Sequence, residues 1–367
     1  KICNRCVMDT NVLDIIFDNN GNCNFCNEFL DKTLFYKNLI SEKKLNYLIN
    51  SIKKQQMNYK YDCLVGISGG VDSAWALKKV VELGLRPLAV HFDNGWNTNM
   101  SQENIYNLLD KLKIDLITYV VDWEEYKDIM KSFFKANVTD IELIYDNALM
   151  KVNYSTAKKY NIKYILAGTN RSTEGMRMPK NWNWFKYDKK NIYSIHKKFS
   201  NNKIKSLPTI GTFEYIYYGI INGIKWINFL DYFDYDKKFA MKELNSYCGF
   251  NMYKGKHSES IFTRFYQGYI LPKKFKIDKR KVHLSNLVIT NQLSRKDALS
   301  MLKLNSYNAE IDFLRDKKYF LKKMNFSESF FNNYINTKKQ NHDVYNSEKK
   351  LWIRLEHIYK KFLKKIQ

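Results

Sequence analysis

Four cysteines near the start of the sequence have the spacing of a metal site. Cys3 and Cys6 form one pair, and Cys23 and Cys26 form a second pair after 16 intervening residues. Each pair offers two thiolates to one tetrahedral ion, for which zinc is the usual occupant. Four thiolates leave no open position for a substrate, so we predict a structural Zn²⁺. An iron–sulfur cluster is the alternative.

A glycine-containing motif at residues 68–73 has the composition of an anion-binding loop. Its sequence is Ser-Gly-Gly-Val-Asp-Ser, and it follows an apolar run and opens a predicted helix. A Gly-Gly turn lets backbone N–H groups approach an anion, and a helix N-terminus adds partial positive charge. Asp72 can hold Mg²⁺ that bridges phosphates. A plain helix cap is the alternative. The predicted ATP-binding residues are Ser68, Gly69, Gly70, Val71, Asp72 and Ser73, with Asp72 and Ser73 as catalytic residues.

Polar residues also follow the second and fourth predicted strands. In an open parallel sheet, nucleotides bind at the carboxyl ends of the strands. Ordinary loops are the alternative for any single residue there. The further candidates for ATP binding are His91, Asp93, Gly168 and Thr169, and those for substrate binding are Asn94, Trp96, Asn170, Arg171 and Glu174.

Strands and helices alternate from residue 61 onward, and they must position these residues. The order predicts an α/β fold with a parallel sheet flanked by helices. The predicted strands are 61–67, 86–92, 115–121 and 163–167, and the predicted helices are 72–83, 101–112, 123–135 and 145–160.

The flanking regions follow other patterns. Residues 31–58 are predicted to be helical, residues 175–210 are irregular, and a helical period dominates beyond residue 211, including a core or interface helix at 215–233. We therefore predict four parts: a zinc-binding module at 1–30, a connecting helix at 31–59, an ATP-binding domain at 60–200 and a mainly helical substrate or partner region at 201–367.

The composition indicates a folded, strongly basic protein. The net charge is +24, but only nine of the 61 basic residues are Arg. Nucleic-acid-binding surfaces usually contain Arg as well as Lys, and A/T-rich codons also produce abundant Lys and Asn. We expect an anionic substrate, such as a nucleotide or sugar nucleotide, rather than nucleic acid. Apolar runs are too short for a membrane span, and clustered cysteines without a signal sequence favour the cytoplasm.

The motif at 68–73 resembles the pyrophosphate-binding loop of the ATP pyrophosphatase (PP-loop) superfamily. The resemblance implies an adenine nucleotide alpha-hydrolase-like fold with ATP and Mg²⁺ as cofactors. In such enzymes the loop holds the β,γ-pyrophosphate while a substrate oxygen attacks the α-phosphorus. A nucleophile, usually ammonia or a sulfur donor, then displaces AMP.

Segments along most of the chain resemble one family within this superfamily, the N-acetyl sugar amidotransferases of bacterial O-antigen and pseudaminic acid biosynthesis. The segments are the cysteine motif with 6–10 and 17–18, the loop 68–73, and 93–96, 168–174, 256–259, 264–265, 271–275 and 278–281. The C-terminal segments add the candidate substrate residues Lys256, His257, Glu259, Arg264, Lys279 and Arg280. A structural polar cluster around His257 and a solvated turn at 279–281 are the alternatives.

The resemblance implies that an acetamido group on a sugar or nucleotide sugar becomes an acetamidino group. It also implies that ammonia comes from a separate glutaminase, similar to that of imidazole glycerol phosphate synthase. The chain's own cysteines agree with this, because Cys63 lies inside a predicted strand and Cys248 has no recognisable nucleophile context.

A tRNA-thiolating PP-loop enzyme is the main rival interpretation. Such enzymes also combine zinc knuckles with this loop and are basic. They usually need reactive cysteines near the nucleotide, whereas this sequence has no cysteine between Cys63 and Cys248. A non-catalytic zinc-ribbon protein that binds nucleic acid is a third class, but it would not need the loop at 68–73.

Overall fold

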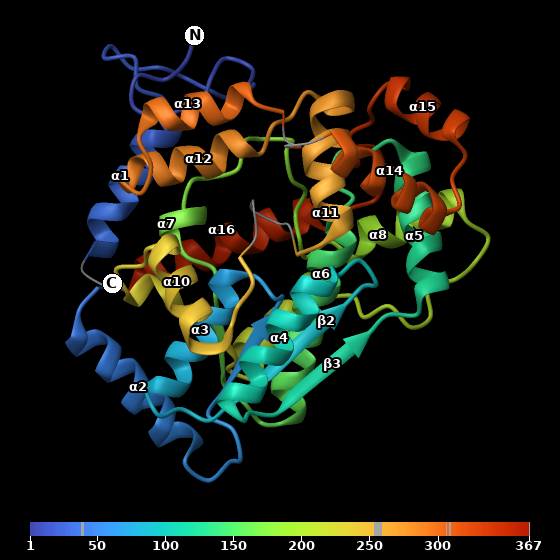
Figure 1. Ribbon diagram of the computed structural model, residues 1–367. Helices are drawn as coiled ribbons and strands as arrows, with labels where there is room; N and C mark the ends of the chain where they lie inside the picture. The colour runs from blue at the N-terminus through green and yellow to red at the C-terminus, as the bar shows by residue number, and fades with distance from the viewer. Residues whose placement is uncertain (38–39, 253–258, 306, 308–309, 367) are drawn as a thin grey trace.

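A five-stranded parallel sheet lies at the centre of the protein. The computed structural model describes residues 1–37, 40–252, 259–305, 307 and 310–366 (Figure 1). The strands are β1 (Cys63–Ile67), β2 (Pro87–Asp93), β3 (Leu116–Val120), β4 (Tyr164–Ala167) and β5 (Lys225–Asn228). Their order across the sheet is β3-β2-β1-β4-β5, and every neighbouring pair is parallel. Leu64 of β1 pairs with Leu88 of β2 and with Ile165 of β4.

The central strand β1 is apolar throughout because both faces of the sheet are covered there. Successive side chains of a strand point to opposite faces. Leu64 accordingly joins the large hydrophobic cluster on one face, whereas Cys63 and Val65 join the cluster on the other face. This arrangement explains the unbroken apolar run that the sequence shows before residue 68.

Helices form a layer on each face. The cluster that contains Val65 includes residues of α2, α3, α4 and α10, and the cluster that contains Leu64 includes residues of α5, α6 and α8. The helices are α1 (Asn24–Lys37), α2 (Glu42–Gln56), α3 (Val71–Glu82), α4 (Asn99–Leu112), α5 (Trp123–Ala136), α6 (Leu143–Lys159), α7 (Arg171–Glu174), α8 (Lys189–Phe199), α9 (Thr212–Ile216), α10 (Lys237–Cys248), α11 (Ile261–Phe265), α12 (Arg280–Ile289), α13 (Arg295–Lys303), α14 (Glu310–Met324), α15 (Glu328–Asn336) and α16 (Lys349–Ile366), with π-helical turns η1 (Tyr217–Ile221) and η3 (Tyr266–Phe275) and 3₁₀ turns η2 (Phe229–Tyr232) and η4 (His342–Val344).

The first thirty residues pack against two helices from the last third of the chain. Figure 1 shows α12 and α13 beside the N-terminal segment. The Val7 amide donates to Ser285 Oγ of α12 at 3.3 Å. The Arg295 guanidinium of α13 donates to the carbonyl oxygens of Cys6 and Cys3 at 3.0 and 2.7 Å. The N-terminal module is therefore built into the molecule by contacts that are distant in sequence.

Three sequence-based expectations about elements were wrong. The predicted helix at 31–58 is two helices, α1 and α2, and residues 38–39 between them lie outside the described residues. The irregular region at 175–210 contains α8. The predicted helix at 215–233 is replaced by a π-helical turn, the edge strand β5 and a 3₁₀ turn. Gly223, with a φ of +62°, ends the helical turn before β5.

The sheet extends beyond the predicted ATP-binding segment, because β5 comes after residue 200. Within the described ranges, no helix is both long enough and apolar enough to cross a bilayer.

Candidate functional site

The order in which the chain adds strands to the sheet reverses between β1 and β4. The chain proceeds from β1 to β2 and β3 on one side, whereas β4 leads to β5 on the other. Ligands of open α/β sheets bind outside the strands at such a point. The two predicted loops, 68–73 after β1 and 168–174 after β4, both begin there.

The loop after β1 has the geometry that close approach of an anion requires. Gly69 has a φ of +80°, and Gly70 caps the N-terminus of α3. Ser68 Oγ accepts a hydrogen bond from the Gly70 amide at 3.3 Å and lies 3.3 Å from Ser73 Oγ. The amides of the first turn of α3 have no acceptor within the helix and carry partial positive charge. The loop can therefore hold a phosphate group.

Gly168 brings the end of β4 directly against this loop. A Cβ atom at Gly168 would lie 2.7 Å from both the N and Cα atoms of Ser73. Only glycine permits this contact between the two backbones. The structure thus joins two segments that the sequence had indicated separately.

Asp72 points to a tyrosine from a distant segment. The Tyr235 hydroxyl donates a hydrogen bond to Asp72 Oδ1. Tyr235 is 2% exposed, and burial raises the pKa of its hydroxyl, which therefore stays protonated as a donor. The Asp72 carboxylate can hold Mg²⁺ at the loop, and its position is fixed by this bond.

His91 and Asp93 of β2 take part in hydrogen bonds that shape the strand ends. His91 Nδ1 lies 2.9 Å from the Ile67 carbonyl oxygen and so acts as a donor, while Nε2 accepts from the Asn97 amide at 3.0 Å. Asp93 Oδ1 accepts from the Gly95 amide at 2.7 Å. A cavity of about 520 Å³ between α4 and β3 is lined in part by His91 and Asp93. Both residues lie at the carboxyl end of β2, and His91 is buried.

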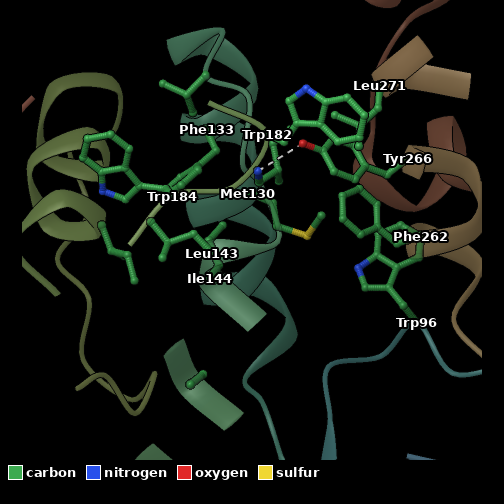
Figure 2. Packing of buried hydrophobic residues seen from close by; sticks show 14 of the residues in the cluster. Trp96, Met130, Phe133, Leu143, Ile144, Trp182, Trp184, Phe262, Tyr266 and Leu271 are labelled. Carbon is green, nitrogen blue, oxygen red and sulfur yellow. Dashed lines mark hydrogen bonds between the residues drawn. The ribbon is translucent and has the colours of Figure 1, made fainter. Parts of the chain in front are cut away.

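Asn94 and Trp96 lie deeper than substrate contacts usually do. Asn94 is 5% exposed and Trp96 is fully buried. Figure 2 shows the Trp96 indole beside Phe262 in the core, and the Trp96 and Phe262 rings have centroids 5.5 Å apart. The structure uses Trp96 to pack the C-terminal region against the loop after β2.

The loop after β4 is held by the segment that follows β5. Thr169 Oγ1 donates to Asn228 Oδ1 at 2.7 Å, and the Arg171 amide donates to Asp231 Oδ1 at 2.7 Å. Asn170 caps the short helix α7 by accepting from the Thr173 amide at 2.9 Å. These bonds fix the loop next to the phosphate-binding motif. Sequence reasoning missed Asn228 and Asp231 as site residues because the segment 215–233 was assigned to a core or interface helix, and it missed Tyr235 because no motif marks it.

Glu259, at the start of the C-terminal region, lies next to the loop at 68–73. The Thr98 amide donates to the Glu259 carbonyl oxygen at 2.9 Å. A Cβ atom placed on Gly70 would lie 3.3 Å from Glu259 Oε1, so this carboxylate stands directly over the loop. The neighbouring candidates Lys256 and His257 lie outside the described residues.

The other C-terminal candidates form internal ion pairs. Arg264 donates to both oxygens of Asp316, at 2.6 and 2.8 Å. Lys279 donates to Glu142 at 3.0 Å, with only 7% and 11% of the two side chains exposed. Arg280 forms an ion pair with the Asp278 carboxylate at 2.7 Å. In this structure these cations are matched by partners within the fold.

The four N-terminal cysteines converge as the sequence predicted. Their sulfur atoms all lie within 4.8 Å of one another, and all four residues are fully buried. The Cys3–Cys26 and Cys6–Cys23 sulfur distances are 3.7 and 3.8 Å. Zn–S bonds of about 2.3 Å in a tetrahedron require sulfur atoms about 3.8 Å apart. Amides of Cys23 and Met8 donate to sulfur at 3.2 and 3.4 Å. The donor set fits zinc.

The two remaining cysteines have no features of a nucleophile. Cys63 is fully buried in β1, and Cys248 at the end of α10 lies 3.3 Å from the Leu244 carbonyl oxygen. Burial raises the pKa of both thiols, so neither is favoured as a thiolate at neutral pH.

Two family models match separate parts of the chain. Residues 40–177 match the NAD synthase family. This matched segment contains the strands β1 to β4 and the loop at 68–73, and β5 lies outside it. Residues 259–359 match a family described as "LPS biosynthesis protein WbpG-like, C-terminal domain". The matched segment begins at Glu259, the residue next to the loop at 68–73.

Individual relatives are distant. A protein described as "Uncharacterized protein MJ1599" from Methanocaldococcus jannaschii is 27% identical over 128 residues, or 35% of this chain and 44% of the relative. This chain thus spans less than half of that relative's length. Among solved structures, NMN synthetase from Francisella tularensis is 18% identical, with 63% of this chain and 98% of that chain covered and a TM-score of 0.29. NH3-dependent NAD synthetase from Campylobacter jejuni is 15% identical, with 57% and 83% covered and a TM-score of 0.30. Such low TM-scores bear on neither fold nor function.

Proposed function

We propose that the protein is an ATP-dependent, AMP-forming amidotransferase that converts the acetamido group of a surface-polysaccharide sugar into an acetamidino group. The observation that carries the proposal is the union of two parts. A glycine loop with the geometry for a phosphate group lies in an NAD-synthase-like segment, and a WbpG-like segment places Glu259 over that loop. The first part supports ATP use, and the second supports a role in lipopolysaccharide biosynthesis.

The chemistry needs ATP because an amide is a poor electrophile. In the proposed first step, the acetamido oxygen attacks the α-phosphorus, the bond to the β,γ-pyrophosphate breaks, and an O-adenylyl imidate forms. Ammonia then adds to the imidate carbon and AMP leaves with the oxygen. The loop at 68–73 would hold the pyrophosphate with first-turn amides and serine hydroxyls. Mg²⁺ held by Asp72 would neutralise charge on the phosphates.

The loop after β4 would form the other wall of the site. Gly168 lies against the start of α3, so Thr169 and the α7 segment are the nearest polar groups on the β4 side. Arg171 and Glu174 are our candidates for contacts to the sugar or nucleotide at this wall. Glu259 is the candidate from the C-terminal region.

Ammonia is proposed to come from a separate glutaminase. Desolvation raises the pKa of the buried Cys63 thiol and of the partly buried Cys248 thiol, which supports this, because glutamine hydrolysis by a cysteine nucleophile needs a thiolate. The same property speaks against the tRNA-thiolating alternative, which needs a sulfur-carrying cysteine near the nucleotide.

ATP–pyrophosphate exchange against a panel of acetamido sugars tests the proposal. We expect exchange with a UDP-linked, CMP-linked or free acetamido sugar, and an acetamidino product when ammonium is added. The matching sugars without the acetamido group are the control. Exchange that ignores the acetamido group, or sulfur incorporated into tRNA, would overturn the assignment.

A further inference from the structure

Tyr235 reaches the phosphate loop from outside the NAD-synthase-like segment. Its hydroxyl donates to Asp72 Oδ1, and its ring packs on Trp75, with centroids 5.3 Å apart. Trp75 lies in α3 one turn after Asp72. The ring and the hydroxyl of Tyr235 therefore both contact the first two turns of α3.

The backbone of Tyr235 is held in turn by the C-terminal region. Gln292 lies between α12 and α13, and its side-chain amide donates to the Tyr235 carbonyl oxygen at 3.1 Å. The Gln292 side-chain oxygen accepts from the Lys237 amide at 3.4 Å. Tyr235 is thus clamped from two sides, and a change in its hydroxyl would act on Asp72 rather than on its own position.

A carboxylate that coordinates a metal ion through one oxygen must be oriented so that this oxygen faces the ion. The Tyr235 hydroxyl occupies Oδ1 of Asp72. Within the part of the chain that the structure describes, Oδ2 accepts no hydrogen bond. Ligating carboxylates are commonly oriented in this way, and loss of the orienting partner typically weakens metal binding about 10–100-fold.

We propose that Tyr235 is a positioning residue for Mg²⁺ at the phosphate loop: its hydroxyl fixes Asp72 so that Oδ2 faces the ion. The inference rests on the proposed function, in which Mg²⁺ and ATP bind at residues 68–73.

Direct metal binding tests it. Mn²⁺ replaces Mg²⁺ as a paramagnetic probe, and free Mn²⁺ is measured by electron paramagnetic resonance in the presence of α,β-methylene ATP. We expect Tyr235→Phe to weaken Mn²⁺ binding about tenfold or more. The Mg²⁺ concentration for half-maximal pyrophosphate exchange should rise by a similar factor, and excess Mg²⁺ should restore the maximal rate. A purely structural role would lower the maximal rate without moving the metal dependence.

Tyr164→Phe is the matched control. Tyr164 is also a buried tyrosine of the same hydrophobic cluster, 4% exposed, and its hydroxyl donates one hydrogen bond to Gln55 at 2.6 Å. It lies at the first residue of β4, whereas the loops of the site follow the strand's last residue. We expect it to lose comparable thermal stability and to keep wild-type Mn²⁺ binding.

Asp72→Asn separates the two possible failures. If Asp72→Asn weakens Mn²⁺ binding and Tyr235→Phe leaves it unchanged or tightens it, the positioning role is wrong and the ATP site stands. If Asp72→Asn itself has no effect on Mn²⁺ binding, the metal does not bind at this loop, and the proposed site fails.

Discussion

The adjacent glycines Gly69 and Gly70 of the loop at 68–73 are required for different reasons. Gly69 has a φ of +80°, and a Cβ atom there would lie 2.6 Å from the Ser101 carbonyl oxygen. Gly70 has a φ of −83°, which any residue adopts, and a Cβ atom there would meet only side-chain oxygens at 3.3 Å. A side chain at Gly69 would disturb the backbone, whereas one at Gly70 would contact the Glu259 carboxylate and the Ser68 hydroxyl on the side of the loop where we propose that the phosphate binds.

Gly70→Val and Asp72→Ala should therefore abolish AMP formation without unfolding the protein. The first substitution blocks the approach of the pyrophosphate to the backbone, and the second removes the Mg²⁺ ligand. AMP is measured by chromatography and folding by circular dichroism. Gly69→Val is the contrasting variant, because it should lose thermal stability as well. AMP production at the wild-type rate in either of the first two variants would place ATP elsewhere.

The two cysteines outside the metal cluster should be dispensable for catalysis. Cys63→Ser and Cys248→Ser, alone and together, should keep ammonia-dependent activity within about tenfold of wild type. A tenfold decrease corresponds to a loss of about 1.4 kcal/mol of transition-state stabilisation. Ammonium salts at raised pH should support turnover and glutamine alone should not. Activities are compared on folded protein, because a serine in β1 places a hydroxyl in the core. Glutamine-driven turnover that is lost in either variant would reveal an internal glutaminase.

At the scale of elements, the cysteine cluster is a structural joint. The same knuckles that gather the four sulfur atoms present the carbonyl oxygens of Cys3 and Cys6 to Arg295 of α13. The neighbouring helix α12 holds the loop after β4, since the Met176 amide donates to Asn286 Oδ1 at 2.8 Å. Figure 1 shows α12 between the N-terminal segment and α7. Loss of the metal should therefore affect more than the first thirty residues.

Cys23→Ser should lose the metal and lower the thermal stability of the whole chain. Purified wild-type protein should contain about one zinc per chain, because binding of a structural zinc contributes directly to the free energy of folding. Metal content is measured by mass spectrometry and stability by thermal unfolding. Cys63→Ser, a change at a buried cysteine outside the cluster, is the control and should keep its zinc. Wild-type protein that is metal-free and equally stable would contradict the assignment.

His342 makes the stability of the C-terminal region depend on pH. Burial lowers the pKa of His342 to about 4, from an ordinary value of 6.5. Its Nε2 accepts from the Asp140 amide at 3.2 Å, so the folded state needs the neutral ring. As pH falls below 6.5, the unfolded chain takes up the proton first, and stability is lost down to the folded pKa.

When the pH is lowered from 7 to 5, His342 should lower the free energy of unfolding by about 2 kcal/mol. Chemical denaturation at the two pH values measures the difference. His342→Asn should be less stable at pH 7 but should show a smaller loss on acidification. An unchanged pH dependence in that variant would assign the acid sensitivity to other groups.

At the scale of the whole molecule, features that depend on neighbouring residues in the sequence were predicted, whereas features that depend on residues far apart in the sequence were missed. The strands at the centre of the sheet were predicted because burial on both faces leaves a continuous apolar run. The edge strand β5 was missed, because it has four residues and ends in exposed Lys225 and Asn228. The cysteine pairs and the glycine turn that opens α3 were predicted because each motif is local.

Partners that are brought in by tertiary contacts left no such signal. Tyr235 is 163 residues from Asp72 in the chain, and nothing in its local sequence distinguishes it from other tyrosines. Trp96, which follows a promising loop, lies instead in the core between that loop and the C-terminal helices (Figure 2). The sequence of a loop does not show whether its side chains point to solvent or to the core, because helices from distant parts of the chain decide this.

The joint between the cysteine module and α12–α13 also sets an order of events during synthesis. Val7 and Ser285 are separated by 278 positions, and a ribosome adds roughly 5–20 residues per second. The module therefore emerges on the order of tens of seconds before the helices that cover it. During that interval its thiols stand in the cell without their protein neighbours, exposed to oxidants and to competing metals. Early capture of zinc would protect them, so zinc supply during translation, rather than after it, would set the yield of correctly assembled protein.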